Sequence, residues 1–223
     1  MRFPVVSALT TALTLIGGVL LGGVAGAMVN ERLPGHQGDP VNIALSLIAA
    51  AGGLVVGGAA WGWSMSRITG AGAGGRMTWA GVLGFAPAVV LAFAGLTLGE
   101  YLFVEQRILG LLPIHNIFTM LFTPAAALVT GAGGFALCIG AGRPARAVTL
   151  AAICALGGGI AFLTVNLTMD MLGWRVGAPG AEQRATMITT ALLGNTAAAL
   201  VGGALVGSGL LRREVRLQAR ALS

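Results

Sequence analysis

The sequence predicts an all-α integral membrane protein, with six transmembrane helices forming three parallel two-helix repeats around a pseudo-threefold axis along the membrane normal. Composition predicts the membrane: of 223 residues, 56% are hydrophobic and 9% are charged. A soluble domain carries about 25% charged residues, so this chain could not present an ordinary solvated surface. Its 37 glycines follow no collagen-like period, and small residues let membrane helices approach one another closely.

A repeated motif predicts the three units. Ala-x-x-Leu-Val-x-Gly is found at residues 51–57, 125–131 and 197–203, each time within an apolar run. Because a two-span unit returns to the side where it began, all copies have the same orientation and the axis follows the membrane normal. The single domain 1–223 then divides into repeats of about 1–75, 76–145 and 146–223. The alternative is that such strings recur by chance in so apolar a chain.

Six apolar runs are long enough to cross a bilayer, which takes about 20 residues. They cover about 5–29, 41–65, 78–100, 115–141, 147–172 and 185–211. Pro87 and Pro124 lie inside the third and fourth runs, where proline predicts a kink. Ala25-Gly26-Ala27 resembles a signal-peptidase site, but the first run is longer than the 7–15 apolar residues that are typical of a signal peptide. We therefore interpret it as a span, and cleavage within residues 1–27 stays open.

Arginines set the predicted orientation. The chain has 13 Arg and no Lys, with a net charge of +6. Nine arginines fall on the side of the termini and four on the other side, so the positive-inside rule places both termini in the cytoplasm. Trp61 and Trp63, near the end of the second span, are interpreted as interfacial aromatics. We expect the protein in a bacterial inner membrane, with the lipid bilayer and other membrane subunits as partners and no nucleic acid.

Glycines at a spacing of four are the first candidate functional residues. Residues four apart share a helix face, where glycine makes a groove for a neighbouring backbone. The groove serves packing within this bundle or, alternatively, a face for another subunit. The candidate helix-packing residues are Gly18, Gly22, Gly26, Gly53, Gly57, Gly203 and Gly207.

Polar groups within or beside the spans are the second set. Asp170 and Asn166 are one turn apart near the outer end of the fifth span, and Glu100 ends the third span. They are either boundary residues paired with loop arginines or a cation or proton entry site. Asn195, in the sixth span, is expected to face the interior, because an amide in lipid needs a partner.

Three outer-loop arginines, Arg32, Arg107 and Arg175, occupy equivalent places in the repeats. They either pair locally with an acid at the interface or converge on the axis as an anion site. We expect local pairing.

Sequence features give no support for catalysis or a cofactor. His36 and His115 lie in a loop and at a helix start, a poor match to haem ligation on facing helices. Cys138 and Cys154 have no metal-binding spacing and are interpreted as small buried side chains. No nucleophile–base pair is apparent. We therefore expect no enzyme activity, no cofactor and no metal.

The expected function is that of a non-catalytic integral membrane subunit, a packing or assembly partner in a larger membrane complex. The alternative is a small-molecule or ion transporter or channel, which the repeat and the proline-interrupted spans favour. Substrate, partner identity and oligomeric state do not follow from the sequence.

Overall fold

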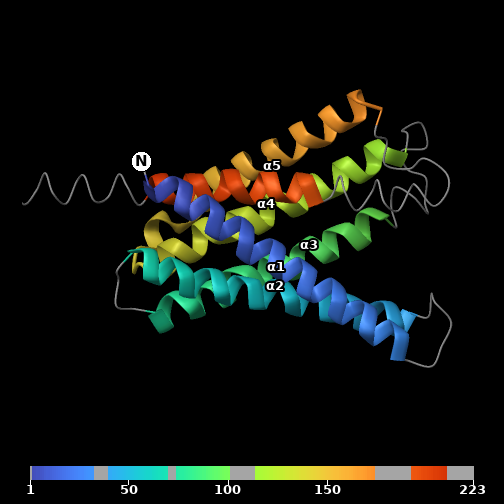
Figure 1. Cartoon of the computed structure of the whole chain (residues 1–223), viewed down its shortest axis with the longest axis horizontal. Helices are drawn as coiled ribbons and strands as arrows, with labels where there is room; N and C mark the ends of the chain where they lie inside the picture. Colours follow the sequence, from blue (N-terminus) through green and yellow to red (C-terminus); the bar gives the residue numbers. More distant parts are fainter. Residues whose placement is uncertain (1, 33–39, 70–73, 101–113, 174–191, 210–223) are drawn as a thin grey trace, which may run out of the picture.

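A computed structural model describes residues 2–32, 40–69, 74–100, 114–173 and 192–209, and these form a bundle of long helices (Figure 1). The helices are α1 (Arg2–Arg32), α2 (Pro40–Thr69), α3 (Gly74–Glu100), α4 (Ile114–Gly140) and α5 (Ala147–Met171). A further helical segment, Leu192–Gly209, follows α5, and we call it the 192–209 helix. The described residues contain no strand.

Five of these helices are long and apolar enough to cross a membrane, as in an integral membrane protein. The candidate spans are Phe3–Gly26, Gly74–Ala92, Thr119–Gly140, Pro144–Met171 and Leu192–Gly209. The helix α2 also covers its predicted run, but it is not among the five, so the sixth span stays a prediction. The predicted start of the last span, residues 185–191, lies outside the described residues.

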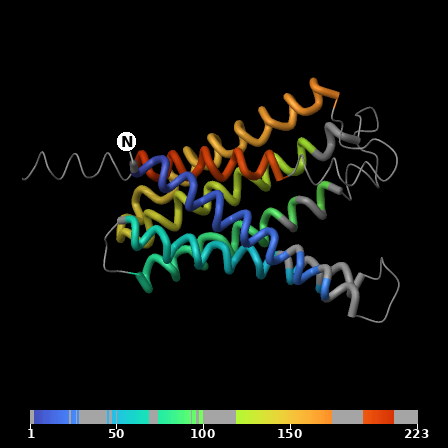
Figure 2. The backbone as a smooth tube through the Cα atoms, viewed as in Figure 1, coloured from blue at the N-terminus to red at the C-terminus, as the bar shows by residue number. Residues whose placement is uncertain are grey.

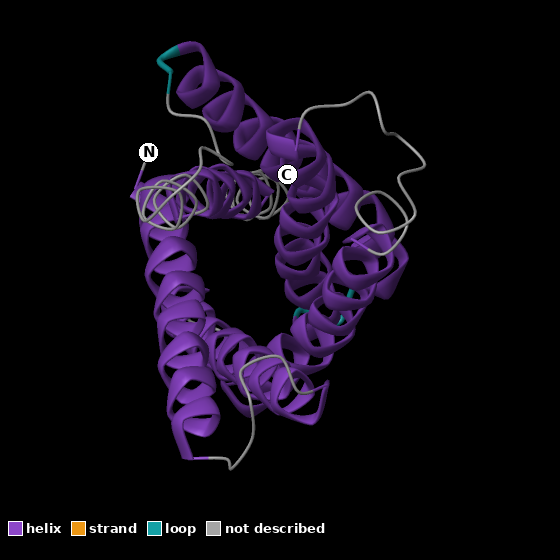
Figure 3. Cartoon of the chain, turned by 90° about the vertical axis from the view of Figure 1, so that its right-hand side faces the viewer, coloured by secondary structure: helices purple, strands orange, loops and turns teal. Residues whose placement is uncertain are grey.

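Successive helices run in opposite directions and pack as neighbours (Figure 2). Viewed from the end opposite the N-terminus, the helices surround a common centre (Figure 3). The 192–209 helix closes the ring, because Gly203 lies against Ser7 and Ala8 of α1 and Gly202 lies against Thr130 of α4. At the end opposite the N-terminus, the α1–α2 pair diverges from α5 (Figure 1).

Close backbone contacts at glycine hold α1 against α2. A Cβ atom placed on Gly18 would lie 2.7 Å from the carbonyl oxygen of Gly53 and 3.0 Å from the Cα atom of Gly57. A Cβ atom on Gly57 would lie 2.7 Å from the carbonyl oxygen of Thr14. These helices therefore approach at a distance that only glycine permits.

The turn between α4 and α5 lies at the same end as the N-terminus (Figure 1). Gly142 adopts φ of +70°, a conformation that glycine adopts without strain, and Pro144–Arg146 forms a short 3₁₀ helix. The guanidinium Nε of Arg76 donates a hydrogen bond of 2.7 Å to the carbonyl oxygen of Gly140. The positively charged Arg76 side chain therefore supplies a hydrogen-bond donor to a carbonyl in the last turn of α4, where the helix dipole favours positive charge.

Candidate functional site

A partly open cavity of about 170 Å³ lies between α1, α2, α3, α4 and the 192–209 helix, and we call it the central cavity. Its lining from the first three helices comprises Leu15, Ile16, Val19, Leu54, Val89 and Ala92.

The remaining lining comes from the second half of the chain, and it includes the two polar residues of the cavity. These residues are Phe122, Ala125, Ala126, Val129 and Thr130 of α4, and Asn195, Ala198 and Ala199 of the 192–209 helix. Residues from all three copies of the repeated motif thus line one cavity. Among the residues that the structure describes, none from α5 lines it.

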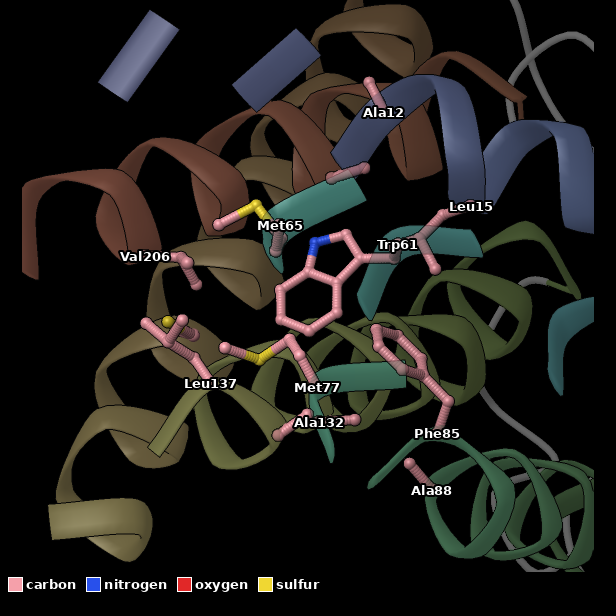
Figure 4. Packing of buried hydrophobic residues seen from close by; sticks show 13 residues of the cluster. Ala12, Leu15, Trp61, Met65, Met77, Phe85, Ala88, Ala132, Leu137 and Val206 are labelled. Carbon is pink, nitrogen blue, oxygen red and sulfur yellow. The ribbon is translucent and has the colours of Figure 1, made fainter. Parts of the chain in front are cut away.

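A cluster of buried apolar side chains packs beside the cavity, and its large members include Trp61, Phe85, Met65 and Met77 (Figure 4). Trp61 and Phe85 are fully buried at its centre, with ring centroids 5.7 Å apart in an edge-to-face arrangement. Met65 and Met77 pack beside them. Leu15 belongs both to this cluster and to the cavity wall, so the cluster forms the floor of the cavity.

The floor contains an interhelical hydrogen bond that sequence reasoning missed. The indole Nε1 of Trp61 donates to Thr11 Oγ1 at 2.9 Å, and the Thr11 hydroxyl donates to the Ser7 carbonyl oxygen at 2.7 Å. The interpretation of Trp61 as an interfacial aromatic is therefore wrong: it faces α1 and α3 and is fully buried. Trp63, two residues on, points the other way and is half exposed, with the Arg67 guanidinium 5.0 Å from its ring centroid.

The candidate polar residues come from three helices: α3, α5 and the 192–209 helix. Asn166 is buried, and its Nδ2 donates to the Phe162 carbonyl oxygen at 2.9 Å. Asp170 is half-buried one turn further along α5, whereas Asn195 lines the central cavity. Glu100 is the last residue of α3, and its side chain lies outside the described part. A cation or proton entry site at these residues stays a prediction.

The three outer-loop arginines also stay untested. Arg32 ends α1, but its side chain is not described, and residues 107 and 175 lie outside the described ranges. Their local pairing therefore remains an expectation. His36 is likewise outside, and the side chain of His115 is not described.

Both cysteines are free and buried. Cys154 belongs to the floor cluster, where its Sγ is 3.9 Å from the carbonyl oxygen of Gly202. Among the described residues, no group of three or more His, Cys, Asp or Glu side chains lies together.

Six of the seven candidate glycines lie buried at contacts between helices of this chain. A Cβ on Gly203 would lie 2.8 Å from the Ser7 carbonyl oxygen, and one on Gly207 would lie 2.6 Å from the Cα atom of Pro4. A Cβ on Gly53 would collide with the backbone of Gly22. Gly26 is also buried near the end of α1.

Comparison with protein families, curated proteins and solved structures gives no match to this chain.

Proposed function

We propose that this chain is a non-catalytic integral membrane subunit that assembles with another membrane protein through the exposed face of α5. The observation that carries the proposal is the exposure of this helix. The span Pro144–Met171 is the most apolar of the five, yet 22% of its most apolar stretch is buried, against 39 to 50% in the others.

The buried residues of α5 lie on the side of the helix that faces α4 and the 192–209 helix. Cys154, Gly158, Phe162 and Asn166 follow one another at intervals of four residues, which places them on one side of the helix. Gly158 packs against Thr130 of α4, and Phe162 packs against Gly194 of the 192–209 helix. Gly159, Ala151 and Gly157 flank these four residues and also contact neighbouring helices. The opposite face, with Leu156 and Ile160, is exposed among the described residues.

Two hydroxyl groups distinguish this exposed surface from a purely lipid-facing one. Thr164 and Thr168 are exposed, and each donates a hydrogen bond of 2.8 Å to the carbonyl oxygen one turn earlier. Threonine is enriched where membrane helices associate, because its small polar side chain packs closely and bonds across helices. Because both protons are donated within α5, these residues offer a partner helix small side chains that permit close packing and not free donors.

Extraction at native expression in mild detergent tests the subunit role. We expect a stoichiometric partner to co-purify with the wild-type chain and with Leu13→Trp, which alters an equally exposed face of α1. We expect Ile160→Trp, on the exposed face of α5, to lose the partner. If the wild-type chain purifies without a partner, the subunit role is contradicted and transport becomes the favoured function.

We also propose that the three repeats are parallel units with both termini in the cytoplasm. Two motif glycines support the equivalence of the repeats, because each lies against the first helix of the next repeat around the ring. Gly131 lies against Ala151 of α5, and Gly203 lies against α1. Gly57 departs from this pattern by lying against α1 of its own unit. The end of α2, which carries Arg67, the start of α3, which carries Arg76, and the turn after α4, which carries Arg143, lie at the end of the bundle where the N-terminus is (Figure 1). The positive-inside rule assigns that end to the cytoplasm.

Small-molecule transport is the second candidate, because the central cavity is lined by all three motif copies. Uptake into vesicles containing the purified chain would distinguish it from the subunit role. Transport predicts solute uptake by the chain alone, whereas the subunit role predicts none.

A further inference from the structure

The central cavity is apolar on almost every side. Twelve of its fourteen lining residues are apolar, and the two polar ones are Thr130 and Asn195. The Thr130 hydroxyl lies 2.9 Å from the carbonyl oxygen of Ala126 and 3.1 Å from that of Ala127, so its proton is donated within α4. An ordered water needs about two to four polar partners, and this wall is poorly equipped to supply them.

The order of lining residues and floor residues along each helix shows at which end the cavity is closed. In α2 the lining residue Leu54 precedes the floor residue Trp61, and in α3 the floor residue Phe85 precedes the lining residue Val89. Since α2 and α3 run in opposite directions, both helices place the floor on the side of the N-terminus (Figure 1). An occupant is therefore blocked toward the N-terminal end of the bundle by the Trp61–Phe85 pair.

An empty apolar cavity is unfavourable, because its lining atoms lack van der Waals partners on one side. An apolar cavity of about 150 Å³ in another protein stays dry and takes up benzene or xenon. The cavity here measures about 170 Å³, so a ring or a short alkyl segment matches it in size and polarity.

We propose that the central cavity binds a small hydrocarbon group, supplied either by a free apolar molecule or by the end of a lipid acyl chain. This site does not depend on the subunit role of α5, because α5 contributes no described lining residue. The hydrocarbon completes the packing between the α1–α2 pair, α3, α4 and the 192–209 helix.

Photolabelling of the purified full chain in lipid nanodiscs tests the site. One arm uses a short alkane bearing a diazirine, and the other uses a phospholipid with a diazirine at the end of one acyl chain. Labelled residues are mapped by mass spectrometry. We expect label on the buried lining residues Ala126 and Ala199, beyond the unavoidable label on the exposed Leu128 and Val201 of the same helices. Label from the first probe alone identifies a free molecule, and label from the second identifies a lipid chain.

Two cavity-filling variants make the result specific. Ala126→Phe and Ala199→Leu place a side chain in the cavity from different helices, and we expect each to abolish label on the lining while label at Leu128 and Val201 persists. Ala152→Phe, at an exposed position of α5, should leave the pattern unchanged. The proposal is overturned if neither probe labels the lining of the wild-type chain. It is also overturned if lining label persists in a folded variant. If both variants fail to fold, the wild-type map decides alone.

Discussion

Adjacent glycines in α1 offer a matched test of close helix packing. A Cβ on Gly18 would lie 2.7 Å from the Gly53 carbonyl oxygen, whereas a Cβ on Gly17 meets no atom within 4 Å. Ordinary van der Waals contact begins at about 3.4 Å. Gly18→Ala must therefore push α1 and α2 apart by roughly 0.7 Å, and no flexible side chain is present at that contact to move instead.

The magnitude follows from comparing the two variants. Both gain about 0.8–1.0 kcal/mol of helix propensity, so this gain cancels in the comparison. Only Gly18→Ala carries the cost of overpacking, about 1–3 kcal/mol. In a chain of this length 1 kcal/mol shifts the Tm by about 2–4 °C. We therefore expect Gly18→Ala to melt roughly 2–12 °C below Gly17→Ala.

Thermal unfolding in detergent, followed by size-exclusion chromatography of heated samples, measures the difference. Gly22→Leu against Leu20→Ala gives a second pair, since Gly22 is buried and Leu20 is half exposed, and the glycine variant should melt lower. Equal Tm values for Gly17→Ala and Gly18→Ala would refute the argument that glycine is required at this contact.

Three further predictions concern the hydrogen bond in the cavity floor, the last turn of α4 and the orientation of the chain in the membrane. Thr11→Val removes the acceptor of the Trp61 indole and should lower the free energy of unfolding by about 0.6–1.7 kcal/mol, as measured by denaturant titration in mixed micelles. Arg76→Gln removes the cation from the last turn of α4 and should cost about 0.3–1 kcal/mol in the same titration. In intact cells, an impermeant thiol reagent should label Gly38→Cys but not Gly72→Cys, because the positive-inside rule places position 38 outside.

Controls separate these effects from general damage. Thr14→Val, on the same helix, removes a hydroxyl that donates to the carbonyl oxygens of Thr10 and Thr11, so an equal loss there would argue against the interhelical bond. Arg146→Gln changes an exposed arginine at the same end; if it matches Arg76→Gln, the cap at Gly140 is not the cause. Label at position 72 without label at position 38 would reverse the orientation.

The helices were predictable because bilayer-length apolar runs are separated by short loops rich in Gly, Pro and Arg. The predicted run 147–172 matches Ala147–Met171, and the predicted run 115–141 matches Ile114–Gly140. Burial of individual faces was harder to predict. Trp61 and Trp63 are two residues apart, yet only Trp61 faces the interior. Local sequence does not reveal this difference, because Thr11, the hydrogen-bond partner of Trp61, lies 50 residues away in the chain.

The cavity could not be predicted, because small residues have two opposite effects on packing. At Gly18 and Gly53 the absence of a side chain brings two backbones into contact. At Ala126 and Ala199 a small side chain instead lines open space. The outcome depends on how neighbouring helices cross, which local sequence does not encode. The peripheral place of α5 is likewise a property of the assembled bundle.

Site-specific photocrosslinking on α5 tests the proposed subunit role most directly. A photoreactive amino acid is placed at Leu156 and at Leu167 of α5, and at Leu13 of α1 as the control; all three side chains are more than half exposed. The subunit role predicts one discrete protein adduct from both α5 positions in native membranes and none from Leu13. Adducts with lipid alone at Leu156 and Leu167 would contradict it.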